Sequence, residues 1–115
     1  MQKDDIIRLR HMLDAANEAI EFTQNKTRST LDTDRQLVRA LVKDIEIIGE
    51  AATKVTKEFQ KNLPQIPWQN IIGMRNRLIH AYFDINLNIL WKTVTEDLPP
   101  LIFELEKIVS TEDGS

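Results

Sequence analysis

One short segment, residues 73–83, holds most of the side chains in this chain that could do chemistry. Arg75, Asn76 and His80 lie close together within it. A guanidinium stays protonated in proteins and binds phosphate oxygens through paired hydrogen bonds. A histidine titrates near neutral pH and can give or take a proton. Together they could cleave an RNA phosphodiester without a metal: the histidine would move a proton as the ribose 2′-oxygen attacks, and the arginine would stabilise the phosphoryl oxygens.

The position of Arg75 on a helix has two interpretations. At helical spacing, Asn76 and His80 share a face, Arg77 lies beside them, and Arg75 falls within an apolar arc. A buried charge must find a partner, so Arg75 could extend to solvent or pair with a core glutamate such as Glu50. Alternatively it faces a cleft and binds a phosphate. Spacing alone leaves both interpretations open.

Other candidate sites are weaker. His11 stands among charged residues on the first expected helix, and we expect it only to be exposed to solvent. Arg77 and Lys92 could add positive charge for RNA binding, although solvated side chains are the ordinary case. The chain has two histidines, no cysteine and no Gly-rich phosphate loop. We therefore expect neither a metal site nor a nucleotide cofactor.

Composition indicates one small globular domain. The chain has 115 residues, of which 42% are hydrophobic and 29% charged, with a net charge of −3. This charge argues against a broad cationic surface for nucleic acid, but not against positive charge confined to one site. The sequence has neither a membrane-spanning apolar run nor a signal peptide, so we expect a cytoplasmic protein without membrane contact.

Apolar residues recur at helical spacing along most of the chain, which predicts an all-α fold. We expect an up-down bundle of four long helices with a short fifth piece: helices over about 4–22, 33–55, 67–83 and from 87, and a last piece over 101–109. Thr33 and Gln36 suggest a capping box, and Asp84 or Asn86 a later cap. Pro99 and Pro100 should end or kink the fourth helix. The domain should span residues 1–109, with a disordered tail over 110–115.

The motif Arg75-Asn76-x-x-x-His80-x-Tyr82 resembles the R-x-x-x-x-H-x-Y motif of HepT-like ribonucleases of the HEPN superfamily. The resemblance extends over nearly the whole chain, from Asp5 to Val109. It includes further segments: Ile47-Ile48-Gly49-Glu50-Ala51-Ala52, Pro67-Trp68, Gly73-Met74-Arg75-Asn76, and the helix from Leu87 with Trp91.

This resemblance implies a HEPN-like helical homodimer that cleaves RNA in a cleft shared between its third helices. It implies the toxin of a type VII-like toxin–antitoxin pair, with a minimal nucleotidyltransferase as antitoxin. Arg75 and His80 would be catalytic, Asn76 would support them, and AMP transfer to Tyr82 would silence the toxin. If the helix stays regular, Tyr82 shares a stripe with Arg75, so an adduct would lie beside the arginine.

A second function remains possible from the sequence. The chain could be a non-catalytic helical adaptor that binds a nucleotidyltransferase or RNA, with the motif kept for structure. The apolar residues expected nearly all round the third helix favour a homodimer under either function.

Overall fold

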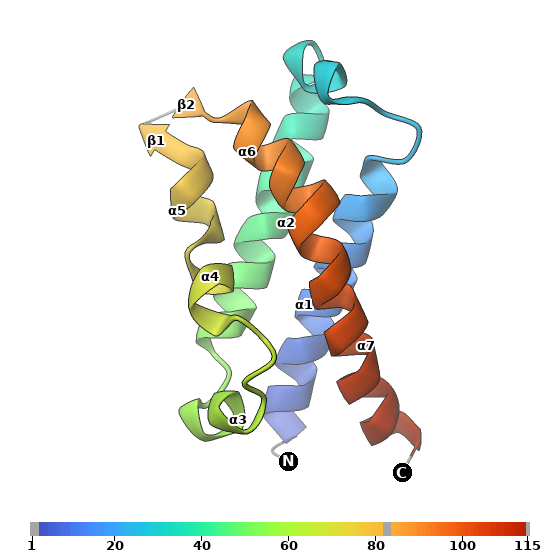
Figure 1. Ribbon diagram of the computed structural model, residues 1–115, viewed down its shortest axis with the longest axis vertical. Coiled ribbons are helices and arrows are strands. Elements are labelled where there is room, and N and C mark those ends of the chain that lie inside the picture. The colour runs from blue at the N-terminus through green and yellow to red at the C-terminus, as the bar shows by residue number, and fades with distance from the viewer. Residues whose placement is uncertain (1–2, 82–83, 115) are drawn as a thin grey trace.

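The fold is all-α, as the sequence predicts, and three long helical rods form its body. The computed structural model describes residues 3–81 and 84–114. Helices α1 (Lys3–Phe22) and α2 (Arg35–Thr53) lie side by side, and a rod made of α6 (Leu87–Lys92), a π-helical turn (Thr93–Asp97) and α7 (Leu98–Gly114) crosses them (Figure 1). The third of the four predicted long helices, over residues 67–83, is absent as a single element.

Helices α1 and α2 form where the apolar periodicity places them. In α1, Leu9, Met12, Ala16 and Ala19 are fully buried, and the small alanines let α2 approach closely. A 3₁₀ helix, Arg28–Asp32, lies in the stretch between the first two predicted helices.

The start of α2 differs from its prediction. Asp34, rather than Thr33, is the N-cap: its side chain accepts a hydrogen bond from the backbone N–H of Leu37 at 3.0 Å. The predicted capping box of Thr33 and Gln36 is therefore wrong, because the N-cap of α2 is one residue later than predicted.

The end of α2 is tied back to the beginning of α1. The carboxylate of Asp5 is buried and accepts two hydrogen bonds from Thr56, from its backbone N–H at 2.9 Å and its hydroxyl at 2.8 Å. Thr56 in turn caps the short helix α3 (Lys57–Asn62) through the N–H of Phe59. Both oxygens of this buried carboxylate thus have a partner, which offsets the cost of its burial.

The segment expected to be the third long helix is divided into short elements. Helix α4 (Trp68–Ile72) ends at Gly73, α5 (Met74–Leu78) follows, and Ile79 turns to an extended conformation. Strand β1 (Ile79–Ala81) then pairs antiparallel with β2 (Asp84–Ile85), with Ile79 opposite Ile85. A mid-helix glycine costs about 1 kcal/mol, and backbone pairing with β2 offers the residues after Leu78 an alternative to helix.

The rod formed by α6 and α7 passes through the prolines that were expected to end or kink it. Asn86 caps α6 as predicted, accepting from the N–H of Ile89 at 3.0 Å, whereas Asp84 lies in β2. Pro99 and Pro100 lie in the first turn of α7. Proline cannot donate to the carbonyl four residues before it, and the wider π-helical turn at Thr93–Asp97 accommodates that loss.

Helix α7 continues to Gly114, so the helical domain extends beyond Val109, through residues expected to form a disordered tail. Only Ser115 of that predicted tail lies outside the described residues.

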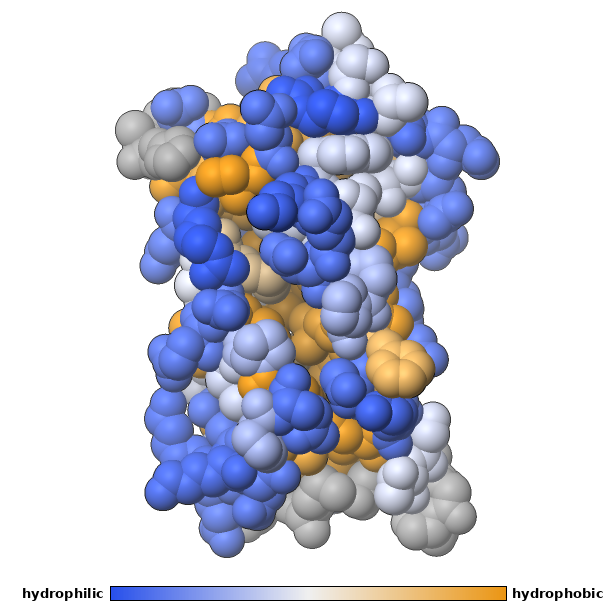
Figure 2. All heavy atoms as spheres, viewed as in Figure 1, coloured by the Kyte–Doolittle hydropathy of each residue, from blue (hydrophilic) through white to orange (hydrophobic). Residues whose placement is uncertain are grey.

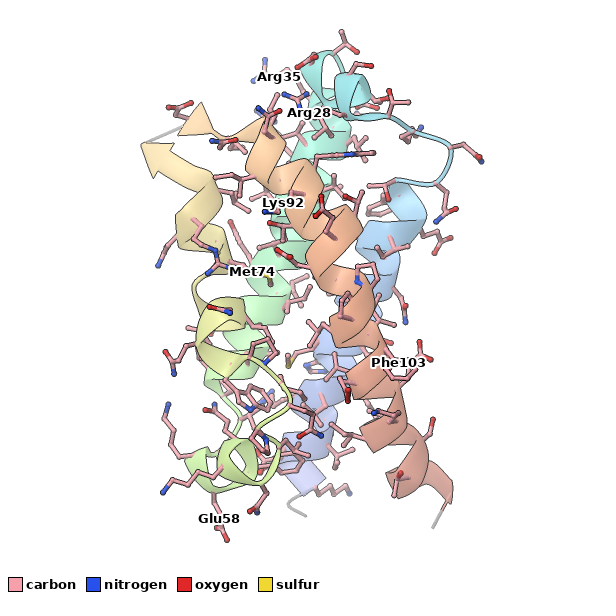
Figure 3. All side chains as sticks on the ribbon, in the orientation of Figure 1. Arg28, Arg35, Glu58, Met74, Lys92 and Phe103 are labelled. Atoms are coloured by element: carbon pink, nitrogen blue, oxygen red, sulfur yellow. The ribbon has the colours of Figure 1, made fainter. Side chains whose placement is uncertain are left out.

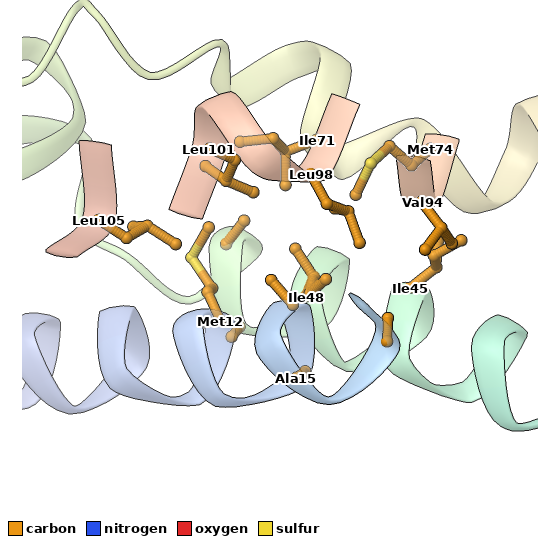
Figure 4. Packing of buried hydrophobic residues seen from close by; sticks show 14 of the residues in the cluster. Met12, Ala15, Ile45, Ile48, Ile71, Met74, Val94, Leu98, Leu101 and Leu105 are labelled. Atoms are coloured by element: carbon orange, nitrogen blue, oxygen red, sulfur yellow. The ribbon is translucent and has the colours of Figure 1, made fainter. Parts of the chain in front are cut away.

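The apolar core lies between α1, α2, α4–α5 and the rod. In Figure 4, Ile48 of α2 lies near Met12 of α1 and Ile45 lies near Val94 of the rod, while Leu98 and Leu105 of the rod close the core from the other side. The short helices contribute Ile71 and Met74 to the same cluster. Burial in this core fixes how α4–α5 lies on α2, and thereby where the chemical side chains of residues 75–77 point. Among the described residues, no helix is both long and apolar enough to cross a bilayer.

Candidate functional site

A cleft of about 450 Å³ lies where α5 meets α1 and α2. Arg75 and Asn76 line it from α5, and Gly49 and Glu50 form part of its α2 wall. The cleft thus contains two of the residues that the sequence singled out, and it supports the second interpretation of Arg75, in which the guanidinium faces a cleft.

The guanidinium of Arg75 is held by a carboxylate across this cleft. Its Nε donates a hydrogen bond to Oε1 of Glu46 at 3.1 Å. The side chain of Arg75 is 50% exposed, so it is not the buried arginine that the apolar arc suggested. Glu50, the partner offered by the first interpretation, instead pairs with Lys54 at 3.4 Å. Among the described residues, this guanidinium makes its hydrogen bond through Nε, so its two terminal nitrogens can bind a ligand in the cleft.

Sequence reasoning missed the part of the cleft that α1 and the middle of α2 supply. Arg8, His11 and Lys43 line it together with Arg75. The cleft has four cationic side chains (Arg8, Lys43, Lys54 and Arg75) against two carboxylates (Glu46 and Glu50), although the whole chain is negative. Helical spacing could have shown that Arg8 and His11 share a face, but not that this face lies opposite Arg75. His11 is exposed, as expected.

Two predicted RNA-binding residues lie outside this cleft. Arg77 points to the other side of α5, where its Nη2 donates to the backbone carbonyl of Asn70 at 2.8 Å. Lys92 is exposed on α6, on the face of the molecule seen in Figure 3, and does not line the cleft. The structure therefore separates Arg77 and Lys92 from Arg75 and Asn76.

His80 is not carried by the same helix as Asn76. Helix α5 ends at Leu78, and His80 belongs to strand β1, so the predicted shared face of Asn76 and His80 does not exist. The side chain of His80 and the whole of Tyr82 lie outside the described part of the chain. The predicted stripe joining Arg75 to Tyr82 assumed a regular helix between them, and that condition is not met, because α5 ends at Leu78.

A buried carboxyl group sits next to the cleft. Asp44 of α2 is only 1% exposed, and its Oδ2 has no hydrogen-bond partner among the described residues. It lines a small hollow with His11, Asp14 and Glu18 of α1. Burial, followed by hydrogen bonding and repulsion from Glu18, raises the pKa of Asp44 to about 7. Asp44 is therefore partly protonated at neutral pH.

The described residues contain no cluster of three acidic or histidine side chains suited to a metal ion. The guanidinium, amide and ammonium groups that line the cleft can bind and neutralise phosphate oxygens. The two histidines, His11 in the cleft and His80 in β1, are candidates for a proton-transfer group.

Comparison with known proteins agrees with this chemistry. A family model described as "Ribonuclease HepT-like" matches residues 12–108. A protein of Methanocaldococcus jannaschii named "Putative RNase" is 38% identical over 95 residues, which cover 83% of this chain and 87% of that protein. A "Probable ribonuclease HepT" of Thermococcus cleftensis is 40% identical over 95 residues, covering 79% and 86%. No solved structure matches this chain.

Proposed function

The chain belongs to the HepT-like ribonuclease family, and from that premise we propose that it is a metal-independent endoribonuclease that uses Arg75 and His80. The family and the names of the relatives support cleavage of RNA in general terms. The observation that carries the finer proposal is the cleft, where Arg75 and Asn76 line one wall and the cationic side chains of Arg8, Lys43 and Lys54 contribute to the rest. Such a cleft suits a phosphodiester, because paired guanidinium nitrogens match two phosphate oxygens.

The proposed reaction is an internal transfer of the phosphate to the ribose. His80 accepts the proton of the 2′-hydroxyl, and the 2′-oxygen attacks the phosphorus. The bond from phosphorus to the 5′-oxygen breaks, and that oxygen takes the proton that His80 removed from the 2′-hydroxyl. The products are a 2′,3′-cyclic phosphate and a 5′-hydroxyl. Arg75 stabilises the charge that develops on the non-bridging oxygens, and Asn76, beside it in the cleft, supports their binding.

We further propose that the active form is a homodimer. The prediction of a homodimer relied on apolar residues around the third expected helix. In the structure, however, Ile71, Met74 and Leu78 of α4 and α5 are buried in the core. Exposed apolar side chains that could form an interface include Ile7 of α1, which is 37% exposed, and Ile47 of α2, which is 36% exposed. Ile47 also lines the cleft. A symmetric contact on this face would bring two clefts together. Light scattering at micromolar concentration measures this directly, and a monomer would contradict it.

The family resemblance also supports a place in a type VII-like toxin–antitoxin pair. In this proposal the protein is the toxin, a minimal nucleotidyltransferase is its antitoxin, and AMP transfer to Tyr82 silences it. The physical reason is general: AMP adds a negative charge and a large purine near a site that must bind phosphate. With Tyr82 outside the described residues, this part of the proposal depends on the resemblance and needs a direct test.

The decisive experiment incubates purified protein with RNA in a chelator. We expect the wild type to cleave, His80→Ala to retain its helical circular dichroism and lose cleavage, and Arg75→Lys to be severely impaired because an ammonium lacks the paired geometry. His11→Ala is the matched control, since His11 is the other histidine of the chain and lines the cleft.

Loss of activity in the chelator, with recovery on adding magnesium, would refute the proton-transfer mechanism. Loss of cleavage in His11→Ala, together with full cleavage by His80→Ala, would show that the general base is His11 on α1 rather than His80. A wild type that binds RNA without cleaving it would favour the non-catalytic adaptor.

A further inference from the structure

A second groove, of about 700 Å³, lies on the other side of α5 from the cleft, between α4–α5 and α7. It is framed by Met74 on α5 and Phe103 on α7, both labelled in Figure 3. Figure 2 shows apolar residues at the floor of a hollow near the middle of this face, with hydrophilic residues around it. Phe103 is 63% exposed, which is unusual for so large an apolar side chain.

The groove combines an apolar floor with an acidic rim. Ile71, Met74 and Leu101 form part of the floor. The rim carries three carboxylates, Glu96, Asp97 and Glu104, against one cation, Arg77, whose guanidinium already donates to Asn70. Glu96 and Asp97 are exposed and make no ion pair with the residues that the structure describes. Carboxylates placed beside an apolar surface favour a ligand that is both apolar and positively charged.

The chain's own Lys107 illustrates which chemistry the rim prefers. Its ammonium lies 3.0 Å from Oε2 of Glu104 and 4.8 Å from the centre of the Phe103 ring. One cation thus contacts a carboxylate and an aromatic face at the edge of the groove. Glu96 and Asp97 present the same type of carboxylate on the rim, and neither forms an ion pair with a lysine in the part of the chain that the structure describes.

We propose that this groove is a docking site for a segment of a partner protein that carries apolar side chains flanked by lysine or arginine. Apolar side chains of the segment fill the floor between α4–α5 and α7, and its cations pair with Glu96 and Asp97. An amphipathic helix laid in a groove is a common form of such recognition. The acidic rim repels nucleic acid and anionic lipid, so the groove and the positively charged cleft bind different kinds of molecule.

The groove and the cleft share a wall. The five-residue helix α5 presents Met74 and Arg77 to the groove, and Arg75 and Asn76 to the cleft. A segment docked in the groove therefore lies directly behind the residues that we assign to RNA. The docking site is inferred independently of that assignment and is tested without measuring cleavage.

The test is fluorescence anisotropy of a labelled peptide titrated with the full chain. The probe is an amphipathic helix of about 16 residues made of leucine and lysine, and a second peptide carries glutamate in place of lysine. We expect the leucine–lysine peptide to bind and the leucine–glutamate peptide not to bind. Phe103→Ser should weaken binding about tenfold, because it removes an exposed apolar contact without opening the core.

A double charge reversal separates docking from general attraction to an acidic protein. The double variant Glu96→Lys with Asp97→Lys should bind the leucine–lysine peptide about tenfold more weakly, or weaker still. The matched control is Glu21→Lys with Glu58→Lys, which changes the net charge equally at exposed positions that do not line the groove. This control should leave the affinity within about twofold.

The proposal would be overturned if the two double variants lost affinity for the leucine–lysine peptide equally. It would also be overturned if the wild type bound the leucine–lysine and leucine–glutamate peptides equally well. A groove that is covered by a second copy of the chain would overturn it too. That result would appear as a dimer in light scattering that Phe103→Ser converts to a monomer.

Discussion

The Nε atom of Arg75 donates a hydrogen bond to Oε1 of Glu46 at 3.1 Å, and this contact orients the arginine that we assign to catalysis. The two residues lie on different helices, α5 and α2, and both side chains remain partly exposed to the cleft. Glu46 can therefore hold the plane of the guanidinium while its terminal nitrogens face a phosphate. The same carboxylate also adds a negative charge that an incoming phosphate must tolerate.

Substitution of Glu46 should separate these two effects. Glu46→Gln keeps an oxygen that can accept from Arg75 and removes the charge, so we expect a lower KM for RNA with little change in kcat. Glu46→Ala removes the acceptor as well, and we expect kcat to fall about tenfold, because a loosely held guanidinium stabilises the transition state less well. Steady-state cleavage of a short RNA measures both.

Glu50→Gln is the control for Glu46, since Glu50 lines the same cleft but pairs with Lys54 instead of Arg75. It should lower KM in a similar way, and Glu50→Ala should leave kcat unchanged. Identical kcat values for Glu46→Ala and Glu50→Ala would show that Glu46 does not position Arg75.

Tyr82→Phe should remain toxic and escape silencing. The substitution keeps the aromatic ring and removes the oxygen that would accept AMP. Mass spectrometry of the protein, incubated with ATP and a minimal nucleotidyltransferase from the same genome, should show an added AMP on the wild type and none on the variant. An adduct located on another residue, or full silencing of the variant, would contradict this assignment. A variant that is folded but inactive would instead indicate a role for Tyr82 in cleavage.

Asp44 should make the protein less stable as the pH rises toward neutrality. Its pKa is about 7 in the folded chain and 3.8 as an ordinary aspartate. The folded state therefore holds the proton more tightly, and the resulting stabilisation is fully present below pH 3.8. It declines as the pH rises from there and is lost once the pH passes about 7. This makes Asp44 a source of instability at neutral pH.

Asp44→Asn should remove this dependence. At pH 8 the amide carries no charge and can donate to Glu18, so we expect the free energy of unfolding to rise, by on the order of 2 kcal/mol. At pH 4 the variant and the wild type should be nearly equal. Urea unfolding between these pH values measures the difference, and Asp14→Asn, an exposed neighbour, is the control. Parallel stability curves for Asp44→Asn and the wild type would disprove the expectation.

Gly49→Ala should stabilise α2 without disturbing the fold. A Cβ at this position would lie 3.6 Å from the carbonyl oxygen of Ile71 and 3.7 Å from that of Ile72, which are ordinary contacts. Replacing a glycine inside a helix by alanine gains about 0.5–1 kcal/mol. Thermal or urea unfolding should show this gain.

Gly73→Ala is the matched control for Gly49, since its Cβ would lie only 3.3 Å from the carbonyl oxygen of Gln69. It should bring no comparable gain. If Gly49→Ala is instead less stable than the wild type, α4 must pack more closely against α2 than these distances indicate.

The sequence pattern was sufficient to predict the helices whose formation depends on residues close together in the chain. The apolar periodicity located α1 and α2, and Asn86 marked the beginning of α6, because helix periodicity and capping depend on residues a few positions apart. The motif around Arg75 identified the family, which the family match confirms. Local patterns did not distinguish Asp34 from Thr33 as the cap of α2, since both are good caps one residue apart.

Only the tertiary structure decided what surrounds Arg75. Its partner Glu46 is 29 positions away, and Arg8 and His11 reach the cleft from α1, so no helical spacing connects them. The end of α5 at Leu78 was not predicted either, because the apolar spacing of residues 67–83 also fits a continuous helix, whereas the competing state is a short strand that pairs with Ile85 a few positions further along the chain. Sequence periodicity shows which face of a helix is buried, whereas the packing of α4–α5 on α2 determines which exposed side chains share a cleft.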